Sequence, residues 1–277
     1  MHLSFVTINP NKLTIEIEVF LKTVLLCGGK GTRLSEETHI RPKPMVHIGD
    51  RPILWHIMST YAHYGHKDFV CALGYMGDYI KDYFYRFYSV NSDFTINLAS
   101  GGVSYHSEPK RDWNVSLIDT GAESMTGGRL YNLRDFLSNE DTFMLTYGDG
   151  VSDVNVAELV AFHKKHGKIA TVTSVRPPAR FGEMKFDGDR VVEFAEKPQT
   201  STGWINGGYF VFNKEIFNYI AGEHIMLEHE PLQNLAKEGQ LMSYKHDGFW
   251  QCMDTLRDKN YLNEIWEKGK APWAKDV

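Results

Sequence analysis

The stretch Leu25-Leu26-Cys27-Gly28-Gly29-Lys30-Gly31-Thr32-Arg33-Leu34 decides the fold of this chain. It begins inside a short apolar run, residues 23–27, which is typical of a buried strand, and continues into a loop with three glycines in four positions. Glycines let the backbone approach a ligand closely and turn its N–H groups toward it. Lys30, Arg33 and, ten residues further on, Lys43 supply cations that neutralise phosphate. This pattern predicts a nucleotide triphosphate site at the end of a parallel strand.

Two other phosphate-binding motifs do not fit this stretch. The dinucleotide fingerprint G-x-G-x-x-G would need a third glycine where Leu34 stands. The P-loop G-x-x-x-x-G-K-[ST] would need Lys-Ser or Lys-Thr in a frame that these glycines do not provide. The simple alternative is a tight turn with a solvated basic rim.

The composition excludes several classes of protein. With 277 residues, 42% of them hydrophobic, the chain can bury a substantial core. A net charge of −5 argues against a nucleic-acid-binding surface. The three cysteines form no C-x-x-C motif, so we expect free thiols in a reducing cytoplasm. No apolar run is long enough to predict a membrane span, and the first twenty residues do not have the pattern of a signal peptide.

Strand-like and helical segments alternate along the chain from residue 22. The predicted strands cover residues 23–27, 69–73, 94–98, 115–119, 142–146, 169–175, 184–186, 191–195, 208–212 and 241–246. The predicted helices cover residues 52–64, 78–87, 129–137, 154–166, 215–220, 231–238 and 255–269. This alternation predicts one α/β domain over residues 22–277, with a Rossmann-like, mostly parallel mixed sheet, helices on both faces and small β additions.

The first 21 residues look like an N-terminal extension of that domain. Apolar and polar residues alternate from Leu13 to Val19, which predicts a half-buried strand, and Asn9-Pro10-Asn11 is a turn signal before it. A small hairpin and a leader segment both remain open.

A second candidate site element is Tyr147-Gly148-Asp149-Gly150, which follows the predicted strand 142–146. A carboxylate at the carboxyl end of a parallel strand is well placed to hold Mg²⁺. The alternative is an Asp-Gly hairpin turn. Because we expect a helix over residues 154–166 next, and not a paired strand, we favour the metal ligand.

Gly28-Gly29-Lys30-Gly31-Thr32-Arg33-Leu34 together with Lys43-Pro44-Met45 resembles the signature of the sugar-1-phosphate nucleotidyltransferases. The resemblance covers nearly the whole chain from about Lys22, and it is strongest to members that use CTP and glucose 1-phosphate. Cys27 departs from the alanine that is usual in the family. The nucleotide-binding residues that the resemblance implies in this region are Leu26, Cys27, Gly28, Gly29, Lys30, Gly31, Thr32, Arg33, Lys43 and Gly148.

The resemblance also implies a second Mg²⁺ ligand. Taken alone, Asp254 in Trp250-Gln251-Cys252-Met253-Asp254-Thr255 could simply cap the closing helix. The family has a similar stretch whose first aspartate binds the metal, so Asp149 and Asp254 become the predicted pair. Cys252 stands where the family has proline.

A small-residue loop, Gly121-Ala122-Glu123-Ser124-Met125-Thr126-Gly127-Gly128-Arg129, precedes a predicted helix. Backbone N–H groups at a helix start suit an anion, and hydroxyls and an arginine fork add ligands. Such a loop is often merely flexible. The resemblance makes Ser124, Thr126 and Arg129 nucleotide contacts that favour CTP, and implies that the loop reaches a neighbouring subunit.

The sugar-phosphate side of the site follows from Phe194-Ala195-Glu196-Lys197-Pro198 and Trp204-Ile205-Asn206-Gly207-Gly208-Tyr209. By the resemblance, Lys197 binds the phosphate and Glu196 a sugar hydroxyl, although a lysine before proline is also a common surface arrangement. The full set implied for this side is Tyr147, Glu196, Lys197, Asn206, Gly207 and Trp250.

The implied reaction is in-line attack of glucose 1-phosphate on the α-phosphorus of CTP, with Mg²⁺ as cofactor and Arg33, Lys43, Asp149 and Lys197 as catalytic residues. The product, CDP-glucose, would feed deoxysugar and O-antigen polysaccharide synthesis. The alternatives are a uridylyl- or thymidylyltransferase and a non-catalytic nucleotide-sugar-sensing subunit. The family also implies a homo-oligomer, a hexamer by analogy.

Overall fold

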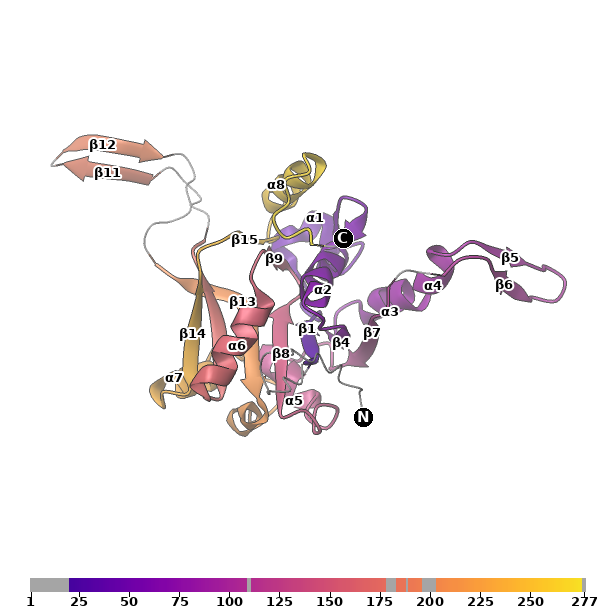
Figure 1. Ribbon diagram of the computed structural model, residues 1–277, viewed down its shortest axis with the longest axis horizontal. Helices are drawn as coiled ribbons and strands as arrows, with labels where there is room; N and C mark the ends of the chain where they lie inside the picture. The colour runs from indigo at the N-terminus through magenta and orange to yellow at the C-terminus, as the bar shows by residue number, and fades with distance from the viewer. Residues whose placement is uncertain (1–19, 109–110, 178–182, 188, 196–202, 276–277) are drawn as a thin grey trace, which may run out of the picture.

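The computed structural model describes residues 20–108, 111–177, 183–187, 189–195 and 203–275. The predicted N-terminal extension therefore lies almost wholly outside the described residues. Figure 1 shows a central sheet with helices packed against it, and an arm made of helices and a hairpin that extends away from the sheet. Within the described part of the chain, no helix is long and apolar enough to cross a membrane.

The central sheet is mixed and mostly parallel, as predicted. β1 pairs in parallel with β4 and β8, β4 with β7, and β10 with β14, whereas β13 runs antiparallel to both of its neighbours. In order across the sheet, the strands are β14 (Leu241–His246), β10 (Ala170–Val175), β13 (Ile205–Asn213), β8 (Thr142–Tyr147), β1 (Thr23–Leu26), β4 (Asp68–Leu73) and β7 (Asn114–Asp119).

Helices cover both faces of this sheet, and for this reason its inner strands read as continuous apolar runs. Leu25 and Met144 face one core cluster, together with α2, α6 and α8, while Val24 and Leu145 face the other, together with α5, η3 and α7. The helices are α1 (Ser35–Thr38), α2 (Ile53–His63), α3 (Gly77–Tyr85), α4 (Phe87–Val90), α5 (Thr126–Asn132), α6 (Val156–His166), α7 (Glu230–Lys237) and α8 (Leu256–Glu267). Short 3₁₀ helices are η1 (Thr32–Leu34), η2 (Lys43–Met45) and η3 (Lys214–Tyr219).

Four two-stranded sheets complete the described structure, and the apolar patterns predicted only part of them. They are β2 (His47–Ile48) with β3 (Arg51–Pro52), β5 (Phe94–Ile96) with β6 (Val103–Tyr105), β9 (Gly150–Ser152) with β15 (Trp250–Cys252), and β11 (Glu183–Asp187) with β12 (Arg190–Ala195). β9 corrects one expectation, because a short paired strand does follow Asp149. It pairs with β15 and does not fold back on β8, so the segment is not an Asp-Gly hairpin.

α5 corrects another expectation. It begins at Thr126 and ends at Asn132, whereas the sequence predicted a helix over residues 129–137. Gly127 and Gly128 lie inside this helix. Both positions need glycine because the backbone of residues 223–227 packs directly on them. An added Cβ would lie 1.7 Å from the Glu223 carbonyl oxygen at Gly128 and 2.8 Å from the Ile225 carbonyl oxygen at Gly127.

Candidate active site

The glycine-rich loop leaves the carboxyl end of β1 in the centre of the sheet. Gly31 adopts a left-handed backbone with φ +62°, and its carbonyl oxygen accepts a hydrogen bond from the Thr38 hydroxyl at 3.1 Å. An added Cβ would meet no atom within 4 Å at Gly29, whereas at Gly28 it would lie 2.1 Å from the Arg129 guanidinium carbon. The loop therefore needs its glycines for close packing at one end and for its turn at the other.

The backbone at the end of β1 is fixed by its two neighbouring strands. The Leu26 carbonyl oxygen accepts from the Gly148 N–H at 3.2 Å, and the Cys27 N–H donates to Ala72 at 3.0 Å. The Cys27 side chain points into the core, where its hydrogen bond with the Cys71 thiol and its burial raise the pKa of the Cys27 thiol well above the usual range. Cys27 thus presents its backbone to the loop while its thiol stays inside.

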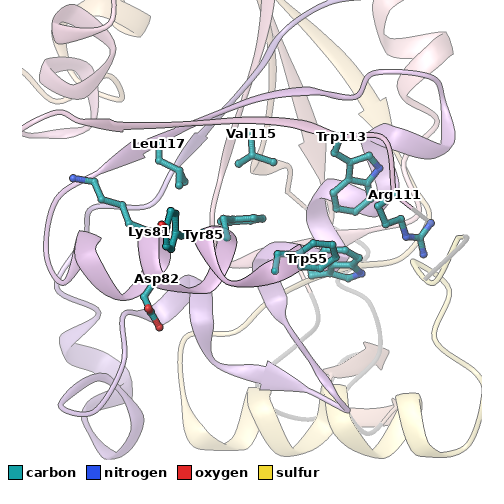
Figure 2. Close-up of a pocket in the computed structure, with 10 residues that line it drawn as sticks. Trp55, Lys81, Asp82, Tyr85, Arg111, Trp113, Val115 and Leu117 are labelled. Carbon is teal, nitrogen blue, oxygen red and sulfur yellow. The ribbon is translucent and has the colours of Figure 1, made fainter. Parts of the chain in front are cut away.

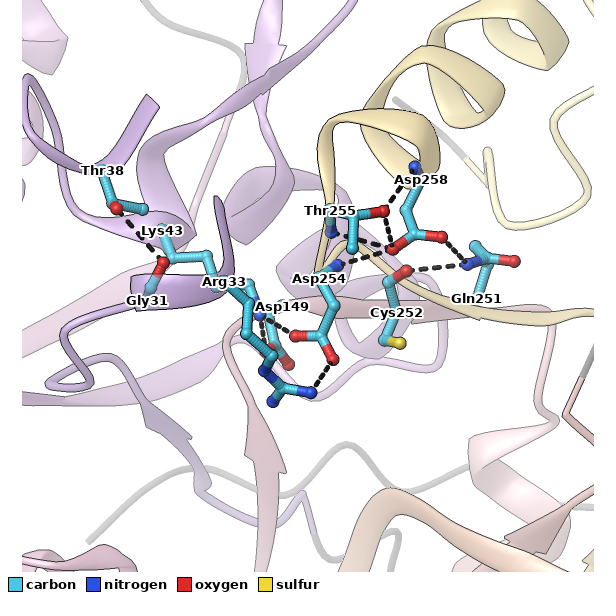
Figure 3. A network of polar contacts seen from close by, with 10 residues as sticks. All are labelled: Gly31, Arg33, Thr38, Lys43, Asp149, Gln251, Cys252, Asp254, Thr255 and Asp258. Carbon is cyan, nitrogen blue, oxygen red and sulfur yellow. Dashed lines mark hydrogen bonds and ion pairs between the residues drawn. The ribbon is translucent and has the colours of Figure 1, made fainter. Parts of the chain in front are cut away.

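Four charged side chains meet beside this loop (Figure 3). The Lys43 ammonium contacts Asp149 Oδ2 at 2.6 Å and also contacts Asp254 Oδ1, and Arg33 contacts Asp254 Oδ2 at 2.6 Å. The Lys43 side chain is only 10% exposed, whereas that of Arg33 is 71% exposed. Burial alone would lower the pKa of Lys43, but the two carboxylates more than offset it and raise that pKa. Two cations and two anions predicted from sequence segments far apart are therefore in direct contact.

The β9–β15 pair brings the two carboxylates together. Cys252 stands opposite Gly150, and the Met253 N–H donates to the Asp149 carbonyl oxygen at 2.8 Å. Asp254 does not cap α8, because Thr255 is the N-cap and forms a capping box with Asp258. Asp258 also accepts from the Asp254 N–H at 3.1 Å. The Asp254 carboxylate is consequently free of a capping role and faces Lys43.

These carboxylates fit a divalent cation that completes its shell with substrate oxygens. Both carboxylates point to one position, which the Lys43 ammonium occupies in this structure. No cluster of three or more histidine, cysteine, aspartate or glutamate side chains arranged for a metal occurs among the described residues. Mg²⁺ in phosphoryl-transfer sites commonly uses one or two carboxylates together with phosphates and water. Asp149 and Asp254 are therefore a suitable donor pair, and an all-protein cage is not required.

A cavity of about 190 Å³ opens next to this cluster. The Asn206 side-chain amide donates to the Tyr147 hydroxyl at 3.1 Å, and the Trp250 indole N–H donates to the Gly207 carbonyl oxygen at 2.8 Å. The four predicted sugar-side residues that the structure describes thus line one cavity with the predicted metal ligands. Its lining is Arg33, Thr146, Tyr147, Asp149, Gly150, Asn206, Gly207, Trp250, Cys252 and Asp254. Glu196 and Lys197 lie outside the described residues.

In the loop before α5, the polar side chains predicted as nucleotide ligands form hydrogen bonds within the protein. The Ser124 hydroxyl donates to the Thr120 carbonyl oxygen at 2.6 Å, and the Thr126 hydroxyl to Glu228 at 2.6 Å. The nearly buried Arg129 guanidinium donates to the carbonyl oxygens of Leu73, Gly28, Gly121 and Ala122. In this structure Arg129 ties the loop before α5 to the glycine-rich loop and is not a free fork for phosphate.

Lys30 and Thr32 complete the predicted set. Both are exposed on the glycine-rich loop, and Lys30 pairs with Glu123 of the facing loop at 3.1 Å. Sequence reasoning missed Glu228, which binds both Thr126 and Tyr147. Glu228 belongs to no recognisable motif. The sequence shows there only a charged residue between the apolar Leu227 and the start of α7.

A glycine-rich loop at the carboxyl edge of a mixed sheet, facing paired carboxylates and a buried lysine, defines an enzyme that handles nucleoside triphosphates. The family model described as nucleotidyl transferase matches residues 22–255, so this chain belongs to that family. Within the family, the chain is 49% identical over 253 residues to the glucose-1-phosphate cytidylyltransferase of Salmonella typhi, an alignment that covers 91% of this chain and 98% of the relative.

Other comparisons agree with this assignment. The probable glucose-1-phosphate cytidylyltransferase of Bacillus subtilis is 40% identical over 91% of this chain and 99% of its own length. The crystal structure of HddC from Yersinia pseudotuberculosis superposes with a TM-score of 0.66 at 21% identity, and covers 89% of this chain and 99% of that chain. The structural match confirms the fold alone.

Proposed function

We propose that this protein transfers CMP from CTP to glucose 1-phosphate, which yields CDP-glucose and pyrophosphate. The observation that carries the proposal is the contact of Arg33, Lys43, Asp149 and Asp254 at one end of a cavity lined by Tyr147 and other predicted sugar-side residues. The identity to glucose-1-phosphate cytidylyltransferases over nearly their full length supports the choice of substrates.

The chemistry is a nucleotidyl transfer with no covalent enzyme intermediate. A phosphate oxygen of glucose 1-phosphate attacks the α-phosphorus of CTP in line, a P–O bond forms, and the bond to the β-phosphate breaks as pyrophosphate leaves. The attacking phosphate is already an anion near neutral pH, so no general base is required. The main obstacle is the repulsion between two polyanions, and positioning and charge neutralisation supply most of the catalysis in such transfers.

The chain's own residues divide this work. The exposed Arg33 and the backbone N–H groups of the glycine-rich loop hold the leaving β- and γ-phosphates, and Lys43 turns toward the α-phosphate. Asp149 and Asp254 would hold Mg²⁺, which when bound neutralises phosphate charge and orients it. Lys197 and Glu196 remain proposed contacts to the sugar phosphate and to a sugar hydroxyl. The reaction belongs in the cytoplasm, where CTP is available, and we further propose that its product feeds deoxysugar and O-antigen synthesis.

A nucleotide panel tests the proposal. Purified protein is given glucose 1-phosphate, Mg²⁺ and either CTP, UTP or dTTP, and pyrophosphate release is measured. We expect CTP to give the highest kcat/KM, and preference for UTP or dTTP would transfer the assignment to the alternative enzymes. Asp149→Asn should reduce the rate by several orders of magnitude and leave the fold intact. Absence of turnover with every nucleotide would favour a non-catalytic sensing subunit, against which the complete charged cluster argues.

We also propose that the protein is a homo-oligomer, assembled through the arm formed by α3, α4, β5 and β6. Among the described residues, eight large apolar side chains of this arm are at least 43% exposed: Tyr85, Tyr88, Val90, Phe94, Ile96, Leu98, Val103 and Tyr105. An isolated two-stranded hairpin is marginally stable in water, so a covering partner is expected. At the base of the arm lies an aromatic cavity of about 650 Å³, between Trp55, Tyr85 and Trp113 (Figure 2).

The apolar arm and the aromatic cavity give one chain both halves of a self-complementary contact. Light scattering after gel filtration should give a multiple of the monomer mass, a hexamer by family analogy. Leu98→Glu on the arm should shift the mass downward, whereas Phe136→Glu, at a similarly apolar exposed position outside the arm, should not. A monomeric wild-type protein would overturn this part of the proposal.

A further inference from the structure

The Glu228 carboxylate joins two parts of the site that are distant in sequence. Its Oε1 accepts a hydrogen bond from the Tyr147 hydroxyl at 2.5 Å, and its Oε2 accepts one from the Thr126 hydroxyl at 2.6 Å. Both distances are typical of short hydrogen bonds to an ionised acceptor. Each carboxylate oxygen therefore serves a different element: the carboxyl end of β8 and the start of α5.

On the β8 side, the contact leads into the cavity. The Tyr147 hydroxyl also accepts from the Asn206 amide at 3.1 Å, and both residues line the cavity beside Asp149. Burial, with the neighbouring Glu228 charge, raises the pKa of Tyr147, so its hydroxyl stays protonated and donates to Glu228. Glu228 thus holds the Tyr147 hydroxyl, which in turn accepts from the Asn206 amide.

On the α5 side, the contact leads to the glycine-rich loop. The Thr126 hydroxyl oxygen accepts from the Leu227 N–H at 2.9 Å, so that it both donates and accepts within the segment that carries Glu228. One turn further along α5, the Arg129 guanidinium donates to the Gly28 carbonyl oxygen at 2.9 Å. Through Arg129, α5 is therefore attached to the start of the glycine-rich loop.

The rest of the segment is attached to α5 through its backbone. The Met125 N–H donates to the Glu223 carbonyl oxygen, and the Gly128 N–H donates to the Ile225 carbonyl oxygen, each at 3.0 Å. These bonds hold the segment against α5 whatever side chain stands at position 228. What Glu228 adds is the connection onward to Tyr147.

We propose that Glu228 is a positioning residue that couples the nucleotide side of the active site to its sugar side, by holding the Thr126 hydroxyl of α5 and the Tyr147 hydroxyl of the cavity at one carboxylate. This inference rests on the proposed CMP transfer. A carboxylate accepts from both hydroxyls at once, whereas glutamine has one accepting oxygen and one NH₂ donor. Glu228→Gln therefore keeps the shape but removes the charge, and one of the two hydroxyls must turn from donor to acceptor or lose its contact.

Steady-state kinetics with CTP and glucose 1-phosphate varied independently test the coupling. Thr126→Val is expected to raise mainly the KM for CTP, and Tyr147→Phe mainly the KM for glucose 1-phosphate. Glu228→Gln should raise both, each by up to about tenfold, because both hydroxyls lose their ionised acceptor. The matched control is Glu238→Gln, which removes the charged acceptor of an equally short bond from the Tyr219 hydroxyl, 2.5 Å, at an exposed position outside the cavity. A Glu228→Gln protein that is less stable but keeps both KM values and kcat would overturn the proposal.

A second measurement does not depend on activity. Melting temperatures of the Thr126→Val and Tyr147→Phe single and double variants, without substrates, form a double-mutant cycle. Because the two hydroxyls share Glu228, the effects should not add, and in a Glu228→Gln background they should become additive. Additivity in the wild-type background would refute the link through Glu228. If the wild type failed to make CDP-glucose but the cycle showed coupling, the proposed function would fail while the structural link stood.

Discussion

Replacing Lys43 with methionine exposes a cation position that the protein itself fills. The Lys43 ammonium contacts Asp149 and Asp254, and its side chain is only 10% exposed. Methionine has a similar length and no charge. The variant leaves two carboxylates facing each other, with Arg33 as the remaining cation within contact distance of Asp254 among the described residues. We therefore expect Lys43→Met to convert a closed ion cluster into an open divalent metal site.

The magnitude follows from burial and charge. Removing one partner of a buried ion pair costs about 3–5 kcal/mol, because the other charge is left uncompensated. The Asp149 side chain is 29% exposed and that of Asp254 13% exposed, so water screens part of this cost. We expect Lys43→Met to lower the free energy of unfolding by about 3 kcal/mol in the absence of metal. Mg²⁺ at one hundred times its Kd should restore about 2.7 kcal/mol.

The assay is urea unfolding followed by tryptophan fluorescence, without nucleotide, in EDTA and in excess MgCl₂. The wild type should respond little to Mg²⁺, because Lys43 already occupies the position between the carboxylates, and the variant should respond strongly. Mn²⁺ binding measured by electron paramagnetic resonance should show one site in the variant. The matched control is Lys259→Met, which removes a partly buried lysine from a different carboxylate, Glu37. Equal Mg²⁺ responses in wild type and Lys43→Met would refute the reasoning.

Three further predictions follow from packing and titration. Gly128→Ala should lower the free energy of unfolding by about 1–3 kcal/mol, because the added Cβ would meet a backbone carbonyl. Gly222→Ala is the control, because an added Cβ there meets open space, and urea unfolding midpoints of the two variants test the difference. Burial lowers the pKa of His66 to about 4 from 6.5. Between these values the unfolded chain binds the extra proton, so stability should fall by about 3 kcal/mol as pH drops from about 6.5 to 4, and His66→Gln should flatten that pH profile. Burial and, to a smaller extent, the Asp254 charge raise the pKa of the Cys252 thiol to about 12. Its alkylation at pH 8 should therefore be on the order of a thousandfold slower than that of a free thiol, and should become fast when urea unfolds the protein.

The central sheet could be predicted from sequence because its inner strands are covered on both faces. Continuous apolar runs such as the one around Leu25 and the one around Leu145 have that single physical cause. The short pairs were harder to predict, because three-residue strands such as β9 and β15 carry little pattern and their pairing joins residues about one hundred positions apart. For the same reason Asp254 was linked to Asp149 by family resemblance and not by any local signal.

The loop before α5 shows what residue types alone leave open. Ser124, Thr126 and Arg129 have the chemistry of anion ligands, but a sequence does not tell whether a hydroxyl faces solvent or a carbonyl of its own loop. Here the side chains of all three bind protein atoms. Glu228 has the opposite problem, since a single carboxylate outside any motif gives no sign that two hydroxyls converge on it.

The antiparallel direction of β13 has a consequence for how this scaffold can diversify. Ile205 at the start of β13 stands opposite Val175 at the end of β10, so the chain departs from and returns to the same edge of the sheet. Everything between residues 176 and 204, including the β11–β12 pair, is therefore an insertion with adjacent ends. Such a segment can be exchanged for another without moving the strands that carry Asp149 or the glycine-rich loop. The proposed contacts of Glu196 and Lys197 with the sugar and its phosphate lie in this segment, so a chimera that exchanges residues 176–204 would replace them and leave the cavity residues of β8 and β13 in place.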